Sequence, residues 1–130
     1  MNRILIADPG KSSVVMTSEV FKDKMPGTLV DVALTGLQCL ELLPLNTYDM
    51  IVLDFDLPDT DGVTLTKIIR KDFNGPILLT AYPEAIVDHA INKELFAYHD
   101  STSWVPKPVK FDILAEKIEM FLINKLRLYK

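Results

Sequence analysis

The feature that most constrains the fold is a regular alternation of short apolar runs with longer segments of helical periodicity. Three of the five runs are continuously apolar, as expected for strands that helices cover on both faces of a parallel sheet. We expect these strands at residues 4–7, 29–33, 50–53, 77–80 and 103–105. We expect helices in the amphipathic segments at residues 12–25, 36–43, 63–73, 84–96 and 111–128. Because the prolines fall at the proposed junctions, five successive βα units predict a right-handed, doubly wound α/β sandwich.

The helical periodicity also predicts which side chains face the sheet. In the second helix we expect Leu37, Leu40 and Leu43 on the inner side. In the third helix we expect Ile68 and Phe73 to belong to the inner stripe.

Length, charge and cysteine content exclude several classes of protein. The 130 residues suit one domain. The net charge of −4 and the pI near 5.1 argue against sequence-independent nucleic-acid binding, which needs a basic surface. No apolar run is long enough to span a membrane, and the single cysteine, Cys39, can form neither an intrachain disulfide nor a cysteine metal cluster. We therefore expect a cytoplasmic protein that contacts neither nucleic acid nor a membrane directly.

Four polar residues follow the carboxyl ends of predicted strands, namely Asp8, Asp54, Thr80 and Lys107. Taken singly, each has an ordinary interpretation as a helix cap, a turn former or a solvated side chain. In open α/β sheets, however, the carboxyl ends of the strands form the binding crevice. We therefore expect the four side chains to share one cleft.

Phosphoryl transfer to a carboxylate is the chemistry that needs this set. An aspartate can attack as a nucleophile, and a divalent cation and a fixed ammonium offset the charge of the transferred group. In this interpretation Asp54 is the nucleophile, Lys107 supplies the ammonium, and Thr80 supplies a hydroxyl. Asp8 contributes to a site for Mg²⁺, a hard cation that accepts one or two carboxylates and keeps several waters.

Over essentially its whole length the chain resembles the receiver domains of two-component response regulators. The matching segments are ILIAD, DMIVLDFDLPDTDG, ILLTA and a Lys-Pro pair, at residues 4–8, 49–62, 77–81 and 107–108. The resemblance implies an α/β, flavodoxin-like doubly wound (βα)5 sandwich with a five-stranded parallel sheet of order 2-1-3-4-5. It also implies a single receiver domain over residues 1–130, standing alone or forming the N-terminal part of a longer regulator.

The resemblance assigns roles to individual residues. It implies that Asp54 is the phosphoacceptor and a metal ligand, and that the backbone carbonyl of Asp56 is a further ligand of Mg²⁺. Thr80 and Lys107 are the switch hydroxyl and the site lysine, and Trp104 is the aromatic side chain that moves between inward and outward states. The resemblance further implies a cis peptide bond before Pro108.

The chain departs from the family at the metal site. Receivers usually end the first strand with two acidic residues, whereas here Asp8 is followed by Pro9. Proline offers neither a side-chain oxygen nor a backbone N–H. We therefore expect weak Mg²⁺ binding. The Asp56 side chain is a candidate for partial repair, and a solvent-facing loop aspartate is the equally weighted alternative.

A second departure lies between Thr80 and Lys107, where the stretch is longer than in the family and contains His99. A ligand or pH-sensing role for His99 is less favoured than a plain surface position, and His89 is expected on a helix surface. Trp104 has two interpretations, as a switch coupled to Thr80 or as a side chain that packs the sheet edge.

The last helix carries apolar side chains opposite its inner stripe, at Ile113, Met120 and Ile123. They favour a homodimer or partner contact on this helix.

Three functions compete. The leading one is a switch that a histidine kinase, a phosphotransfer protein or a small phosphodonor modifies at Asp54, with no catalysis beyond phosphoryl transfer and dephosphorylation on the domain itself. The altered domain then binds an effector protein or output domain, or dimerises. The second is a degenerate receiver that acts as a phosphorylation-independent interaction module, which Pro9 favours.

The third is a phosphatase of the haloacid dehalogenase type, because Asp54 and Asp56 follow an apolar strand. It lacks suitable acidic ligands after Lys107 and room for a cap domain. A flavin carrier of similar fold is disfavoured because no phosphate-binding loop rich in Ser, Thr and Gly follows the first strand.

Overall fold

The computed structural model describes residues 2–86 and 102–128, without the side chains of residues 86 and 122–128. All neighbouring strands are parallel and follow the order β2-β1-β3-β4-β5, which confirms the predicted fold. The elements are β1 (Arg3–Ala7), α1 (Lys11–Lys24), β2 (Leu29–Ala33), α2 (Gly36–Leu42), the 3₁₀ helix η1 (Leu43–Leu45), β3 (Met50–Asp54), α3 (Gly62–Ile69), β4 (Ile77–Ala81), α4 (Pro83–Ile86), β5 (Thr102–Pro106) and α6 (Phe111–Leu128).

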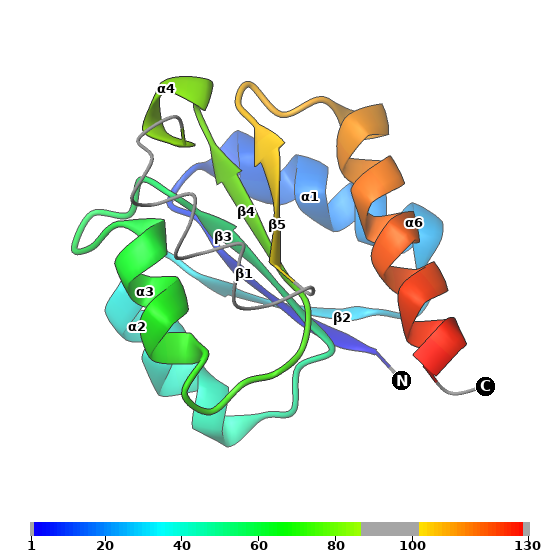
Figure 1. Cartoon of the computed structure of the whole chain (residues 1–130), viewed down its shortest axis with the longest axis horizontal. Coiled ribbons are helices and arrows are strands. Elements are labelled where there is room, and N and C mark those ends of the chain that lie inside the picture. The colour runs from blue at the N-terminus through cyan, green and yellow to red at the C-terminus, as the bar shows by residue number, and fades with distance from the viewer. Residues whose placement is uncertain (1, 87–101, 129–130) are drawn as a thin grey trace.

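The sheet separates two layers of helices and two apolar clusters. Figure 1 shows α2 and α3 on one face of the sheet and α1 and α6 on the other. Every residue of β3 and β4 is buried. The cluster under α2 and α3 includes Leu5, Leu53 and Leu79, whereas Ile6 and Leu78 belong to the cluster under α1 and α6. The continuous apolar runs of the central strands therefore follow from their coverage on both faces.

The prediction that Leu37 faces the core is wrong. Its side chain is 62% exposed, whereas that of Cys39 is fully buried. The helix α2 begins at the buried Gly36, and Cys39, Leu40 and Leu43 follow on the same side about one or two turns later. Leu37 lies about 100° around the helix from Gly36 and points outwards.

The helix α3 ends at Ile69 and not at residue 73 as predicted. The guanidinium of Arg70 donates hydrogen bonds to the carbonyl oxygens of Phe73, at 3.2 Å, and Gly75, at 2.6 Å. These bonds stabilise the turn that replaces the last predicted helical turn. Ile68, expected on the inner stripe, is 41% exposed, while Phe73 still packs against the core.

The C-terminal half confirms two predictions and leaves others untested. The strand β5 lies at a sheet edge as expected, and α6 has the predicted bounds. Of the helix predicted at residues 84–96, only its beginning in α4 is described. His89 and His99 lie outside the described residues, so their assignments stay predictions. No described helix combines the length and apolar character needed to cross a bilayer.

The loop after β3 is tied to the N-terminus of α2. The carboxylate of Asp59 accepts hydrogen bonds from the N–H groups of Gly36, at 2.8 Å, and Leu37, at 2.9 Å. Thr35 adds a side-chain cap by accepting from the N–H of Gln38 at 3.0 Å. These bonds satisfy N–H groups that have no partner within the helix and place a negative charge at the positive end of its dipole.

We predict opposite outcomes for two leucine truncations. Leu79→Ala removes a fully buried side chain and should lower the free energy of unfolding by about 2–5 kcal/mol. Leu37→Ala truncates an exposed side chain and should change it by no more than about 0.5 kcal/mol. Urea unfolding monitored by circular dichroism measures both values. A loss of similar size in the two variants would contradict the observed orientation of α2.

We predict that the Asp59 cap makes stability depend on pH. The N–H groups of Gly36 and Leu37 hold the pKa of Asp59 below its usual value. A lowered folded-state pKa stabilises the protein above the unfolded-state value of about 3.9, and this contribution is lost as pH falls through the folded-state pKa. Asp59→Asn should therefore lower the urea midpoint at pH 7, and its difference from wild type should shrink in acid. Asp23→Asn, on an exposed face of α1, is the matched control and should lack this pattern.

Candidate functional site

The carboxyl ends of β1, β3 and β4 bring three of the predicted residues to one edge of the sheet. Asp8, Asp54 and Thr80 are 6%, 6% and 4% exposed. Asp54 and Thr80 end up opposite each other because they are register partners on neighbouring strands. The N–H of Phe55 continues this pairing by donating to the carbonyl of Thr80 at 2.8 Å. The carboxyl end of β3 is thus fixed to β4 by backbone bonds.

Lys107 reaches the same place from the end of β5. Its Nζ forms an ion pair with Oδ1 of Asp54, and the lysine side chain is only 16% exposed. Its backbone N–H donates to the carbonyl of Ala81 at 2.8 Å, and the peptide bond to Pro108 is cis, as expected. The structure therefore brings the predicted ammonium directly to the predicted acceptor carboxylate.

Asp56 touches both partners of this pair. Its N–H donates to Oδ1 of Asp54 at 3.1 Å. Its carboxylate is 61% exposed and lies 3.5 Å from Nζ of Lys107. Asp56 is therefore at once a loop residue facing solvent and a second counter-ion of the lysine.

Asp8 is held by its own turn. Its N–H donates to the carbonyl of Ala33 at 2.9 Å, and its Oδ1 accepts from the N–H of Gly10 at 2.7 Å. Pro9 between them is exposed. The bond from the N–H two residues on is an Asx-turn, and it engages one oxygen of Asp8.

The chemistry of the residues present fits Mg²⁺. The described residues include no group of three or more acidic, histidine or cysteine side chains that could hold a metal ion. The predicted donor set needs only the carboxylates of Asp8 and Asp54 and the carbonyl of Asp56, because Mg²⁺ completes its shell with water. Asp8 lies close enough to Asp54 for its charge to raise the pKa of that carboxyl.

Burial and pairing act in opposite directions on the charges of the site. Burial raises the pKa of Asp54, whereas the ammonium of Lys107 and the N–H of Asp56 lower it, with a net rise. Burial lowers the pKa of Lys107, but Asp54 and Asp56 outweigh burial and the pKa is raised overall. The rise at Lys107 requires a negative neighbour. We therefore regard Asp54 and Lys107 as an ionised pair at neutral pH.

Trp104 packs on the sheet and is also hydrogen-bonded. Its ring contacts the cluster under α2 and α3, and its Nε1–H donates to the carbonyl of Ala81 at 3.1 Å. Ala81 accepts from the backbone of Lys107 as well. Trp104 and the lysine are therefore joined through one peptide carbonyl next to Thr80.

Sequence reasoning missed two residues of the site. The ring of Tyr82 lies 5.4 Å from Nζ of Lys107, within the range of a cation–π contact. Its signal in the sequence is an aromatic residue two positions after Thr80. At Gly62, a Cβ would lie 2.8 Å from Cα of Phe55 and 3.0 Å from the carbonyl oxygen of Asp54. Glycine is required there because α3 begins directly against the backbone of Asp54 and Phe55.

The arrangement can accept a group that carries negative charge. A buried carboxylate stands beside an ammonium, a strand-end hydroxyl and a second carboxylate. Such a site favours phosphoryl transfer to Asp54 over binding of a neutral ligand, because fixed positive charge stabilises the transferred oxygens.

Comparison with known proteins agrees with this geometry. The family model for the response regulator receiver domain matches residues 4–119. The transcriptional regulatory protein CpxR of Escherichia coli K12 is 28% identical over 122 residues, which cover 94% of this chain and 50% of CpxR. The transcription factor SKN7 of Saccharomyces cerevisiae is 26% identical over 128 residues, covering 96% of this chain and 19% of SKN7. The chain thus spans half or less of these relatives.

A solved structure of a response regulator has the same fold. A two-component response regulator from Clostridium difficile superposes with a TM-score of 0.79 at 30% identity, covering 94% of this chain and 96% of that one. Receiver domains of this kind are signalling modules that generally bind Mg²⁺ through acidic residues. The chain belongs to the family of response regulator receiver domains, the phosphorelay modules of two-component signalling.

Proposed function

We propose that Asp54 is the phosphoacceptor of this receiver domain. The observation that carries the proposal is the ion pair between the buried Asp54 carboxylate and Lys107. A carboxylate oxygen attacks the phosphorus of a phosphohistidine or of a small acyl phosphate. The new O–P bond forms as the bond from phosphorus to the donor breaks, and the donor leaves with that electron pair.

The other residues of the site stabilise the transferred group. The ammonium of Lys107 offsets charge on the phosphoryl oxygens, and the hydroxyl of Thr80 donates to one of them. Mg²⁺ would be held by Asp8, Asp54 and the backbone carbonyl of Asp56, and when bound it supplies further positive charge. Phosphoryl transfer and hydrolysis on the domain itself are the only reactions that we assign.

Phosphorylation of Asp54 adds charge to a site that also holds the carboxylates of Asp8 and Asp56. Lys107 must then divide its contacts between Asp54 and the phosphoryl oxygens. Because Ala81 binds both the Lys107 backbone and the Trp104 indole, this change reaches the outer edge of the sheet. We propose that Thr80 and Trp104 carry the switch in this way.

The partners follow from the same proposal. A histidine kinase or phosphotransfer protein in the cytoplasm supplies the phosphoryl group. The output is an effector protein or an attached output domain, which the relatives named as transcriptional regulators favour. Ile113 and Met120 are 37% and 50% exposed on α6, and this apolar surface supports a homodimer or effector contact.

We predict metal-dependent phosphorylation of Asp54. Incubation with acetyl phosphate and Mg²⁺ should add one phosphoryl group, which intact-mass spectrometry detects, and omission of Mg²⁺ should slow the reaction. Asp54→Asn should abolish the adduct, whereas Asp23→Asn should retain it. Sedimentation velocity on the same samples tests whether phosphorylation increases dimer formation. The Met120→Ser variant tests whether the apolar surface of α6 contributes to that dimer.

Two results would contradict this proposal. If wild type gains no phosphoryl group, the domain works as a phosphorylation-independent interaction module. If Asp54→Asn is still modified, the acceptor lies elsewhere. Steady turnover of a generic phosphate ester would instead favour a phosphatase.

We predict that Pro9 limits Mg²⁺ affinity. Pro9→Asp adds a carboxylate beside Asp8 and should tighten Mg²⁺ binding about tenfold or more, because the ligand charge increases. Pro9→Ala removes the ring without adding charge and is the matched control. Isothermal titration calorimetry with MgCl₂ measures all three proteins. If Pro9→Asp binds no more tightly than Pro9→Ala, another group already occupies that ligand position.

A further inference from the structure

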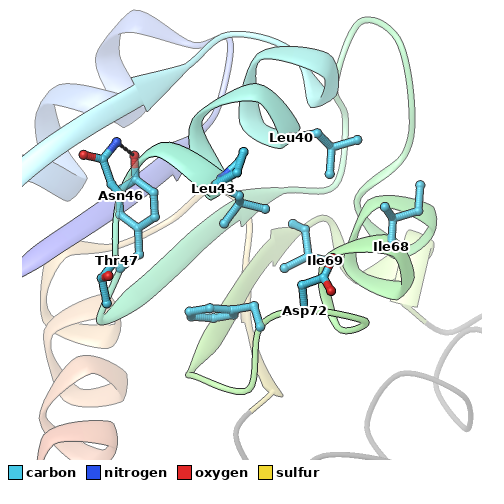
Figure 2. A pocket seen from close by; sticks show the side chains of 10 residues that line it. Leu40, Leu43, Asn46, Thr47, Ile68, Ile69 and Asp72 are labelled. Carbon is cyan, nitrogen blue, oxygen red and sulfur yellow. Dashed lines mark hydrogen bonds between the residues drawn. The ribbon is translucent and has the colours of Figure 1, made fainter.

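A groove separates α2 and η1 from α3, at the opposite end of the sheet from Asp54. Its volume is about 500 Å³, which falls within the range of pockets that bind ligands. Figure 2 shows Leu40, Leu43, Ile68 and Ile69 around it. Asn46, Thr47, Tyr48, Asp72 and Phe73 also line it.

The apolar surface continues beyond the groove. Ile68 on its α3 side is 41% exposed, and Leu37 and Leu45 on its α2 side are 62% and 74% exposed. Leu37, Leu40 and Leu45 are spaced three and five residues apart along α2 and η1, a length of about 12 Å at the rise of a helix. Clustered exposed apolar side chains of this kind mark interaction surfaces more often than isolated ones do.

The two arginines next to the groove are engaged within the protein. Arg3 pairs with Asp31 and donates to Asn46, and Arg70 donates to the carbonyl oxygens of Phe73 and Gly75. Residues 25–66 supply α2, η1 and six of the ten residues that line the groove, and they include no lysine, arginine or histidine. Asp72 is the one charged residue in the lining, and neither Lys67 nor Lys71 belongs to it.

Two carboxylates at the groove, those of Glu41 and Asp72, are available to a partner. Asp72 lines the groove, and Glu41 lies on α2 beside Leu40. Both are exposed, and within residues 2–86 and 102–128 neither forms an ion pair. By contrast, both carboxylate oxygens of Asp59 accept hydrogen bonds from the N-terminus of α2.

Tyr48 and Asn46 in the wall of the groove already form hydrogen bonds within the protein. The hydroxyl of Tyr48 donates to Asp31 at 2.8 Å and accepts from the Asn46 amide at 3.1 Å. The oxygen of that amide accepts from the guanidinium of Arg3 at 2.5 Å. These groups are not directed towards a polar ligand. Apolar contact and negative charge are what the groove offers.

We propose that this groove binds an amphipathic segment of a partner protein, with apolar side chains on one face and lysine or arginine beside them. The apolar face packs against Leu40, Leu43 and Phe73, and the cations approach Glu41 and Asp72. Helix-in-groove recognition has this form. The amphipathic α6 of the same molecule does not compete, because it covers the opposite face of the sheet (Figure 1).

The groove is separate from the phosphoacceptor. It lies near the amino end of β3, where Thr47 and Tyr48 precede the strand, whereas Asp54 is at the carboxyl end. The proposal therefore does not depend on phosphorylation. Peptide binding should be unchanged in Asp54→Asn, so its failure and failure of the phosphoacceptor assignment are distinguishable.

The test uses a defined probe. A synthetic amphipathic peptide of about fourteen residues, with leucine on one face and lysine on the other, is titrated into the full ¹⁵N-labelled chain at about 0.15 M salt. The counterpart peptide carries glutamate in place of lysine. We expect amide shifts in α2, η1 and α3 with the lysine peptide and none with the glutamate peptide.

Variants distinguish peptide binding at the groove from non-specific binding elsewhere on the protein. Ile68→Ser and Asp72→Lys should each weaken binding about fivefold or more, and the matched changes Met120→Ser and Asp23→Lys should alter it by less than about twofold. Absence of shifts at millimolar peptide, shifts centred elsewhere, or equal effects of groove and control variants would overturn the proposal. Concentration-dependent shifts at the groove without peptide would overturn it too, in favour of a second copy as the occupant.

Discussion

The ion pair between Lys107 and Asp54 is the interaction on which the rest of the site depends. Removing either charge from water is costly, and pairing compensates that cost only when the geometry is held accurately. The protein holds it from both sides, because the Lys107 N–H is bonded to β4 through Ala81 and the Phe55 N–H is bonded to β4 through Thr80. The fully buried β3 and β4 are therefore what makes a buried carboxylate tolerable at their ends.

The segment between Asp54 and Gly62 shows how little freedom remains around that carboxylate. Gly62 lies against the backbone of Asp54 and Phe55, and its N–H donates to the carbonyl of Phe55 at 2.8 Å. Asp59, in the same loop, binds the start of α2. One short loop thus joins β3 to both helices that border the groove at the other end of the sheet.

The apolar runs were sufficient for the strands, because buried parallel strands leave a clear apolar signal. The strand order came from the resemblance to receiver domains, and the meeting of Asp54 with Lys107 followed from their positions at strand carboxyl ends. The sequence pattern failed for Leu37 and for the end of α3, where the outcome depended on tertiary contacts. A seven-residue helix carries too few turns to fix its inner side, and the Arg70 bonds that close α3 join residues in a turn that periodicity does not detect. The contact of Tyr82 with Lys107 could not be predicted either, since it depends on the path of the chain after β4.

Pro9 changes the balance between two ways of neutralising Asp54. A second carboxylate after β1 would attract a divalent cation, but in the absence of metal it would also raise the electrostatic cost of ionising Asp54, as the charge of Asp8 already does. With Pro9 in place, Asp8, Asp54 and Asp56 together carry three negative charges, against one positive charge on Lys107. The remaining charge matches a single divalent cation, and Lys107 alone can hold Asp54 when that cation is absent. We infer that Pro9 favours a site whose resting state relies on the lysine, with metal needed chiefly when phosphoryl oxygens arrive.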